Sequence, residues 1–239
     1  EAILDVTPQA LESVDFYTSH EGLHLHYEQA QTRAVPRRDG WYNLSTHMPW
    51  IGNRTRALDG AHVEYFRGIL NPIGVKIGGE IDSRELVDLV TTLNPEKEPG
   101  RLTLIHRFGA DNIGTQLAPA IAAVKGTGVP VLWSCDPMHG NTITTASGLK
   151  TRPFDRILSE LQDSFAIHRD CGSRLGGVHL ELTGDNVTEC IGGAADVTET
   201  DLHVAYKSNV DPRLNYEQAM EIAFLIAAEM NKNERATAD

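Results

Sequence analysis

The sequence lacks the features that several protein classes require. Its three cysteines are an odd number and follow no zinc-like spacing, so neither a disulfide framework nor a cysteine-rich zinc module is indicated. No apolar run approaches the length of a membrane span, and no secretory signal stands at the start. We therefore expect a soluble protein of the reducing cytoplasm with no membrane partner.

Positive charge is also scarce. The chain has 21 lysines and arginines against 33 acidic residues, which gives a net charge of −12. Because nucleic acid backbones are bound by clustered Lys and Arg, this balance argues against a nucleic acid partner, while local basic sites for small phosphates remain compatible with it. An initiator methionine is missing too, since the chain begins with Glu1, and we expect that a preceding segment exists.

The residues that are present suffice for one large core. The chain has 239 residues, 41% of them hydrophobic, which suits one α/β domain over residues 1–239. Apolar, β-branched runs alternate with segments of helical periodicity, the rhythm of parallel β/α units, and about six strands can be counted where a closed (β/α)8 barrel needs eight. The expected strands are 42–50, 73–78, 101–109, 129–133, 176–184 and 205–210. The expected helices are 1–35, 82–93, 111–124, 153–171 and 216–230.

One stretch, residues 129–141, carries the clearest sign of a site. Its apolar first half has the composition of a strand buried on both faces. Polar residues follow at once: Cys135, Asp136, His139 and Asn141. A buried strand that delivers potential ligands at its carboxyl end is what a (β/α)8 barrel uses to build an active site. Cys135 itself we interpret as a small buried core residue.

Each of the later expected strands ends near one ionisable side chain: Lys76, Arg107, His139, Glu181 and Asp211. A charged side chain in an apolar strand is costly unless it is paired, so the joint pattern predicts a shared site. The cations, together with Arg54, suit a carboxylate or phosphate, and the other three residues suit a divalent metal of the manganese or iron type. Taken singly, each has a plainer interpretation as a loop, turn or ion-pair residue.

Longer segments of the chain form recognisable motifs. They are WIGNRTRALDGAHVEYFRG (50–68), NPIGVKIGG (71–79), LNPEKEPGRLTLIHRFG (93–109), CDPMHGNT (135–142), KTRPFDRILSE (150–160), GGVHLELTGDNVTECIGG (176–193) and DPRLN (211–215). Over about residues 16–230 the chain resembles a known family, the class II (plant-type) 3-deoxy-D-arabino-heptulosonate 7-phosphate (DAHP) synthases. The resemblance implies a (β/α)8 barrel, of which this chain supplies roughly the last six β/α units.

The resemblance also implies a reaction, the metal-dependent condensation of phosphoenolpyruvate with erythrose 4-phosphate that begins the shikimate pathway. The implied metal ligands are His139, Glu181 and Asp211, with Mn2+ expected and Co2+ or another divalent cation as alternatives. Phosphoenolpyruvate is expected at Asn53, Arg54, Lys76 and Arg107, and the sugar phosphate at Lys150 and Arg152. The resemblance makes Lys76, Arg107 and His139 the catalytic residues and suggests a homo-oligomer, a dimer or tetramer.

Two departures from the family leave other functions open. The family has an acidic residue where this chain has Asn53, and its cysteine metal ligand, with an arginine and a lysine for substrate, comes from two first strands that have no counterpart here. A non-catalytic barrel remnant that acts as a binding or regulatory partner is therefore a competing hypothesis. A third is a related aldol-type enzyme with another aldehyde acceptor. Primary and secondary metabolism, such as a phenazine pathway, are both compatible with the sequence.

Overall fold

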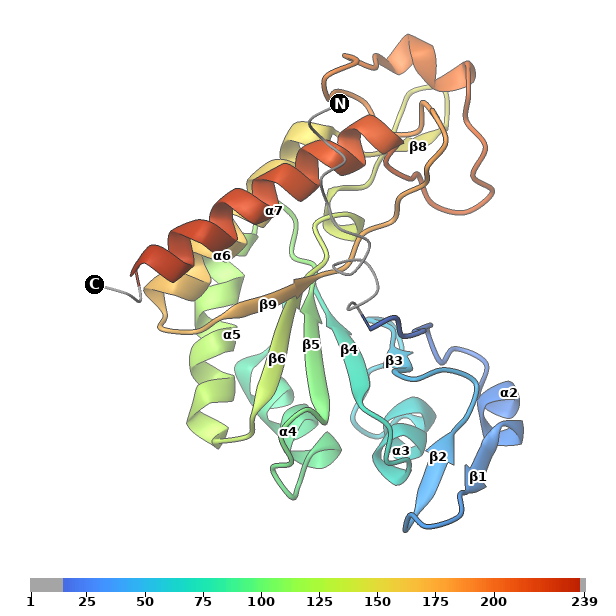
Figure 1. Cartoon of the computed structure of the whole chain (residues 1–239), viewed down its shortest axis with the longest axis vertical. Coiled ribbons are helices and arrows are strands. Elements are labelled where there is room, and N and C mark those ends of the chain that lie inside the picture. The colour runs from blue at the N-terminus through green and yellow to red at the C-terminus, as the bar shows by residue number, and fades with distance from the viewer. Residues whose placement is uncertain (1–14, 237–239) are drawn as a thin grey trace.

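A parallel sheet forms the centre of the computed structural model, which describes residues 15–236 (Figure 1). Each strand pairs in parallel with the next one along the sheet, so neighbours in space follow one another in the chain. The strands, in this order, are β3 (Trp50–Ile51), β4 (Ile73–Ile77), β5 (Leu102–His106), β6 (Val131–Cys135) and β9 (Leu175–Val178).

A helix follows each of these strands, and helices that are successive in the chain contact one another. They are α3 (Ala61–Gly68), α4 (Ser83–Leu93), α5 (Ile113–Thr127), α6 (Phe154–Asp170) and α7 (Tyr216–Ala236). The sequential, parallel order with one helix per strand is the arrangement of a contiguous part of a (β/α)8 barrel. The predicted α/β class is therefore confirmed.

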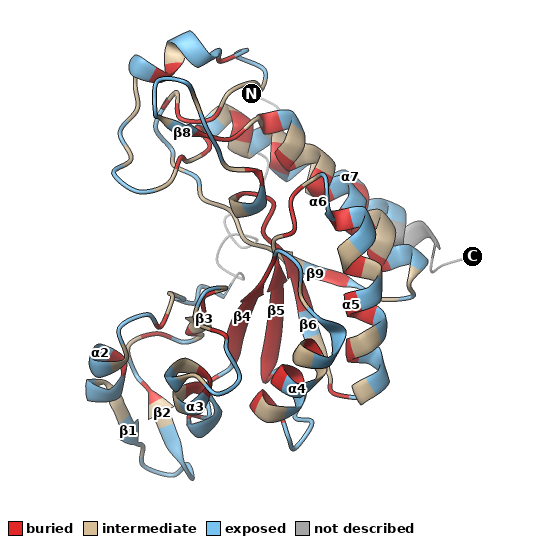
Figure 2. Ribbon diagram, turned by 180° about the vertical axis from the view of Figure 1, so that it is seen from behind, coloured by how far each residue is buried: buried red, intermediate tan, exposed pale blue. Residues whose placement is uncertain are grey.

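The alternation of side chains along the strands explains how the sheet holds both a core and a site. In β4, Ile73, Val75 and Ile77 are fully buried in the main apolar cluster, together with residues of α4 and α5. Gly74 and Lys76 lie on the opposite face, and Figure 2 shows that β4 and β5 are the most completely buried strands. The helix-facing side thus supplies stability, and the other side is free to carry polar groups.

Two pairs of short strands lie outside the central sheet. The antiparallel pair β1 (Thr32–Ala34) and β2 (Trp41–Asn43) follows the short helix α2 (Leu25–Ala30). A second antiparallel pair, β7 (Ile143–Thr144) and β8 (Lys150–Thr151), lies between β6 and α6. The 3-10 helices η1 (His139–Asn141) and η2 (Glu199–His203) complete the described elements.

Three expected elements were wrong. Of the helix predicted over residues 1–35, residues 1–14 lie outside the described part, and the remainder forms only the six-residue α2 before turning into β1. The strand predicted over 42–50 is divided: β2 pairs with β1, and only Trp50–Ile51 joins the central sheet. Residues 205–210 form no strand in the described structure, and the sixth strand position is reduced to a parallel bridge between Leu182 and Leu214.

Candidate metal and anion site

Asp136, the first residue after β6, is the centre of the polar network at the carboxyl ends of the strands. Its Oδ2 accepts a hydrogen bond from Lys76 Nζ and lies 2.7 Å from His139 Nδ1, and its Oδ1 accepts from the backbone N–H of Met138 at 3.0 Å. Burial would raise the pKa of this carboxyl, but the hydrogen bond to His139 and the charge of Lys76 outweigh it and hold the pKa well below its usual range. Asp136 is therefore a carboxylate that orients the His139 ring.

His139 turns its other ring nitrogen toward two carboxylates. The Nε2 atom lies 3.4 Å from Glu181 Oε1 and 3.9 Å from Asp211 Oδ2, and one possible ligand atom from each of the three residues lies within 4.8 Å of the other two. One imidazole nitrogen and two carboxylates form a donor set that suits a divalent cation of the Mn2+ type. A carboxylate behind the ligating histidine, here Asp136, is the usual outer partner in such sites.

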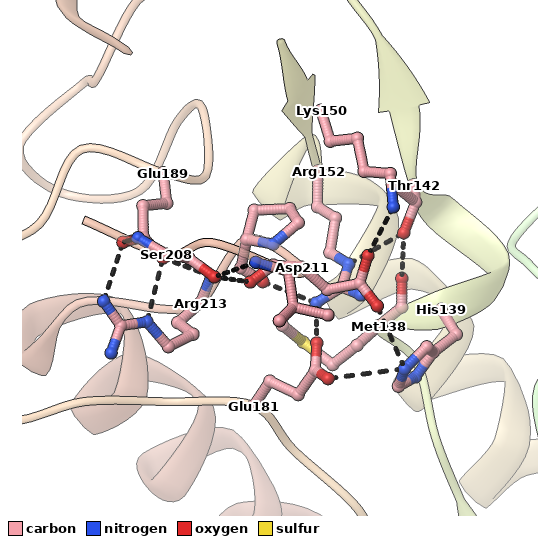
Figure 3. Close-up of polar contacts among 12 residues, drawn as sticks. Met138, His139, Thr142, Lys150, Arg152, Glu181, Glu189, Ser208, Asp211 and Arg213 are labelled. Carbon is pink, nitrogen blue, oxygen red and sulfur yellow. Dashed lines mark hydrogen bonds and ion pairs between the residues drawn. The ribbon is translucent and has the colours of Figure 1, made fainter. Parts of the chain in front are cut away.

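The two carboxylates of this group are also paired with cations, as Figure 3 shows. Lys150 Nζ donates to Asp211 Oδ1 at 2.9 Å, and Arg152 Nη1 donates to Glu181 Oε2. Burial would raise the pKa of Glu181, but the hydrogen bond to His139 and the charge of Arg152 lower it to about 2. Glu181 is therefore kept ionised, as a metal ligand must be.

Arg152 is fully buried, which is rare for an arginine. Its Nε donates to Thr142 Oγ1 at 2.9 Å and its Nη1 to the carbonyl of Pro212 at 2.5 Å, in addition to the ion pair with Glu181. Its Nη2 is buried and has no hydrogen-bond partner in the described part of the chain. A buried N–H donor without a partner is costly, so this nitrogen is an unmet donor of the site.

Lys76 lies nearer to the sheet than the other cations. Only 3% of its side chain is exposed, and its Nζ stands 5.1 Å from the centre of the Trp50 ring. Burial lowers the pKa of Lys76, the charge of Asp136 opposes this, and the nearby positive charge of Arg107 adds to the lowering. Lys76 lies in β4, and Arg107, which directly follows the neighbouring strand β5, donates its backbone N–H to the carbonyl of Ile77 at 2.8 Å.

The structure separates the remaining expected substrate residues from this network. Asn53 is half-buried in the loop after β3, and its Oδ1 accepts a hydrogen bond from Arg56 Nε at 3.3 Å. Arg54 is exposed and makes no hydrogen bond or ion pair within residues 15–236. Arg56, which is not one of the predicted site residues, is the buried arginine of this loop and pairs with Glu85 of α4.

Two loops of the site are packed backbone to backbone. A Cβ atom built on Gly140 would stand 2.4 Å from the nitrogen of Gly109, so the loop after β6 touches the loop after β5 through two glycines. Glu160 of α6, fully buried, accepts from the Gly109 N–H at 2.9 Å and from Asn141 Nδ2 at 2.8 Å. Asn141 Oδ1 in turn accepts from the Ala110 N–H at 3.0 Å. The loops that carry Arg107 and His139 are therefore fixed to each other.

A second group of possible metal ligands, His106, Cys135 and Glu160, lies on the helix-facing side of the sheet. All three are fully buried, and Cys135 is confirmed as a core residue. The carboxylate of Glu160 is already occupied by Gly109 and Asn141, and His106 Nε2 lies 3.1 Å from Ser164 Oγ. We interpret this group as a hydrogen-bonded part of the core.

Sequence reasoning missed three of the residues that shape the site. The sequence shows Asp136 only as a polar residue after its strand, because its link to Lys76 and His139 depends on contacts across the sheet. Glu160 and Glu189 are buried acids on α6 and in the loop after β9. A glutamate on the apolar face of a helix, beside Ile157 and Leu161, is the signal that could have identified Glu160.

Known proteins resemble this chain over most of its length. The model of the class-II DAHP synthetase family matches residues 2–227. A phospho-2-dehydro-3-deoxyheptonate aldolase of Neurospora crassa is 50% identical over 235 residues, covering 92% of this chain and 49% of that protein. A protein of the same name from Streptomyces coelicolor is 48% identical over 220 residues, with the same coverage. The solved structure of such an aldolase from Francisella tularensis gives a TM-score of 0.49 at 19% identity, over 77% of this chain and 55% of that one.

The predicted family is confirmed by the family model and by both relatives. The chain spans about half the length of the curated relatives it matches. In the described residues, no helix combines the length and apolar character that crossing a bilayer requires. The family model covers nearly all of the sequence, including every residue of the candidate site, and the chain therefore belongs to the class-II DAHP synthetase family.

Proposed function

We propose that the protein of which this chain is part condenses phosphoenolpyruvate with erythrose 4-phosphate to give DAHP and inorganic phosphate. The observation that carries the proposal is the position of the His139, Glu181 and Asp211 group beside four cations, Lys76, Arg107, Lys150 and Arg152. An aldol-type reaction between two phosphorylated substrates needs both parts: charge to hold the anions and a polarising group for the aldehyde.

Lys76 and Arg107 are proposed to hold phosphoenolpyruvate. The guanidinium of Arg107 can bind a carboxylate or phosphate with two parallel hydrogen bonds, and Lys76 adds a point charge at the base of the site. Because Lys76 is held by Asp136, its ammonium group stays in one position while the substrate binds. Asn53 and Arg54 are proposed as further contacts of this substrate from the loop after β3.

Lys150 and Arg152 are proposed to hold erythrose 4-phosphate. The buried Nη2 of Arg152 lacks a hydrogen-bond partner within residues 15–236, and Lys150, with 52% of its side chain exposed, can leave Asp211 for an incoming anion. The sugar phosphate would then lie next to the metal-binding group, with its aldehyde directed toward phosphoenolpyruvate.

His139, Glu181 and Asp211 would hold the divalent cation, with Mn2+ as the proposed metal. When bound, such a cation supplies Lewis acid character for the aldehyde oxygen. Asp136 fixes the His139 ring for this task through its hydrogen bond to Nδ1, which leaves Nε2 as the donor atom. A fourth protein ligand, the cysteine that the family resemblance implies, would have to come from outside this sequence.

We propose that these residues supply the last six β/α units of the barrel and that a preceding segment supplies the first strands. The five parallel strands and the bridge at Leu182 and Leu214 support this division. The intact mass of the protein isolated from its source, measured under denaturing conditions, tests it: a mass of 26.2 kDa would contradict the proposal. A cytoplasmic homo-oligomer is the proposed working form, which light scattering of the isolated protein checks.

The activity is tested by phosphate release from phosphoenolpyruvate in the presence of Mn2+ and erythrose 4-phosphate, using the protein isolated from its source as reference. We expect release that requires both substrates, a loss of at least ~100-fold in R107A and H139A, and no change in K125A, which alters an exposed cation of α5. Phosphate release that occurs with other aldehydes but not with erythrose 4-phosphate would favour an aldol-type enzyme with a different aldehyde acceptor. Mn2+ binding without release from any aldehyde would favour the non-catalytic remnant.

A further inference from the structure

Asp211 occupies a loop that has no regular secondary structure. Between η2 and α7 the chain runs through residues 204–215, and Val204 and Val210 are each 76% exposed. The sequence predicted a strand here that would have fixed Asp211, and the structure has none. Lys150 contacts the Asp211 carboxylate itself, so some other interaction must hold the backbone that places this carboxylate within 3.9 Å of His139 Nε2.

The side chain of Glu189 provides that interaction. It is fully buried, and its Oε1 accepts hydrogen bonds from the backbone N–H groups of Lys207 at 3.0 Å and Ser208 at 2.8 Å. Its Oε2 accepts from the backbone N–H of Arg213 at 2.8 Å. One carboxylate thus binds the chain on both sides of Asp211, so the segment 207–213 is closed into a loop around it.

The side chain of Arg213 completes the arrangement, as Figure 3 shows. Its Nε donates to Glu189 Oε2 at 3.0 Å and its Nη2 to Oε1 at 2.8 Å, a two-point contact that balances the buried charge. Burial would raise the pKa of Glu189, but the bonds from the Arg213 side chain and from three backbone N–H groups lower it. The carboxylate therefore has five donors and no free position.

Two further hydrogen bonds connect the part of the loop held by Glu189 to the backbone at Asp211 and Pro212. Ser208, whose N–H is bound by Glu189, donates through Oγ to the carbonyl of Asp211 at 2.7 Å. Arg152 binds the next carbonyl, that of Pro212, at 2.5 Å while it also pairs with Glu181. The carbonyl of Asp211 is thereby linked to Glu189 through Ser208, and the carbonyl of Pro212 is linked to Glu181 through Arg152.

We propose that Glu189 is a positioning residue that holds Asp211 in reach of His139 and Glu181, and so sets the affinity of this site for a divalent cation. The inference rests on the proposed metal-binding role of Asp211. Glu189 is not one of the proposed metal or substrate contacts, and its effect passes through the loop 207–213.

The test compares E189Q with D185N. Glutamine offers only one acceptor oxygen, so at least one backbone N–H and one of the two N–H donors of the Arg213 guanidinium lose their acceptor. Asp185 is the matched control, because it pairs with the Lys207 side chain of the same loop at 3.1 Å while both groups are more than half exposed. We expect E189Q to bind Mn2+ alone about 10–100-fold more weakly, the usual effect of removing an outer support of a metal ligand, and D185N to bind as the wild type does.

Amide hydrogen exchange supplies a readout that does not depend on metal or activity. In E189Q the N–H groups of Lys207, Ser208 and Arg213 should lose protection, while those of α6 keep it. S208A provides a second variant with little risk to folding, and it should weaken Mn2+ binding in the same direction by a smaller factor. The proposal would be overturned if E189Q and S208A both bound Mn2+ as tightly as the wild type while D211N bound it more weakly.

The outcome for D211N separates this inference from the proposed function. If D211N binds Mn2+ as the wild type does, the metal-binding role of Asp211 fails, and the positioning role fails with it. Hydrogen exchange in E189Q would then still measure whether Glu189 closes the loop. If D211N weakens binding but E189Q does not, only the positioning role is wrong.

Discussion

Asp136 and Lys76 form a buried ion pair behind His139, with 0% and 3% of their side chains exposed. Lys76 lies in β4 and Asp136 directly follows β6, and β5 lies between these two strands in the sheet. The pair therefore crosses the face of the sheet that carries the site. Because His139 shares the same carboxylate oxygen, the residue proposed to hold phosphoenolpyruvate and the residue proposed to bind metal depend on one group.

Replacement of Asp136 should therefore damage two functions at once. In D136N, Lys76 stays buried without its counter-charge, and breaking such a pair costs about 3–5 kcal/mol of unfolding free energy. The ring of His139 loses its orienting carboxylate, so Mn2+ affinity should fall about 10–100-fold. Urea denaturation and metal titration measure the two effects. D111N, which breaks the exposed pair with Arg156, serves as control and should change neither.

Lys150 begins the short strand β8 and Arg152 directly follows its end, and their different burial predicts unequal costs of replacement. R152K keeps the positive charge but cannot reach Thr142, Glu181 and the Pro212 carbonyl together, so we expect a loss of about 3 kcal/mol. K150M removes an ion pair whose lysine is half exposed, and such pairs contribute at most about 1 kcal/mol. Equal destabilisation of the two variants in urea would contradict this account.

The contact between Gly109 and Gly140 predicts a severe effect from one methyl group. A Cβ at position 140 would stand 2.4 Å from the Gly109 nitrogen and 2.8 Å from its Cα, and a backbone cannot yield as a flexible side chain does. G140A should therefore separate the two loops and reduce phosphate release at least ~10-fold, since small misplacements of reacting groups are costly. The control is G114A in α5, where nothing lies within 4 Å, and it should stabilise the protein by roughly 0.5–1 kcal/mol.

The sequence predicted the regular elements of the sheet better than its edges. Periodicity located β4, β5, β6, β9 and the helices α4 to α7, because long apolar runs and a clear cap such as Asp82 are local signals. It failed at residues 15–35 and 205–210, where short polar segments obtain their order from distant partners. Glu189 holds the loop at 207–213 from 18 to 24 residues away, and no local pattern reveals such a contact.

In the candidate site too, local sequence signals identify some residues, while contacts between distant parts of the chain decide the others. Strand ends identified Lys76, Arg107, His139 and Glu181, since polar residues after apolar runs are visible in the chain. The structure brings these together with Asp211, Lys150 and Arg152. It leaves Arg54 exposed and puts Arg56 in the buried position of the same loop, and sequence alone cannot distinguish two arginines two residues apart.

Buried histidines predict how the stability of the protein depends on pH. His168 is 1% exposed and its neighbour His106 is fully buried, and burial lowers their pKa values to about 4 and about 3. Between these values and the ordinary pKa of 6.5, the unfolded chain binds protons that the folded protein does not, so their contribution to the unfolding free energy falls as pH decreases through this window. Glu160 acts in the opposite sense, because burial raises its pKa to about 7 and its protonated form favours the folded state below that pH.

Replacing one histidine isolates its share of this balance. In H168N the loss of stability between pH 6.5 and pH 4 should be smaller than in the wild type, by up to about 1.4 kcal/mol for each pH unit. Urea denaturation at several pH values measures the difference, and H26N, which alters an exposed histidine, should follow the wild-type curve. Parallel curves for H168N and the wild type would mean that His168 takes up its proton in the folded protein, which its burial beside His106 and Trp133 opposes.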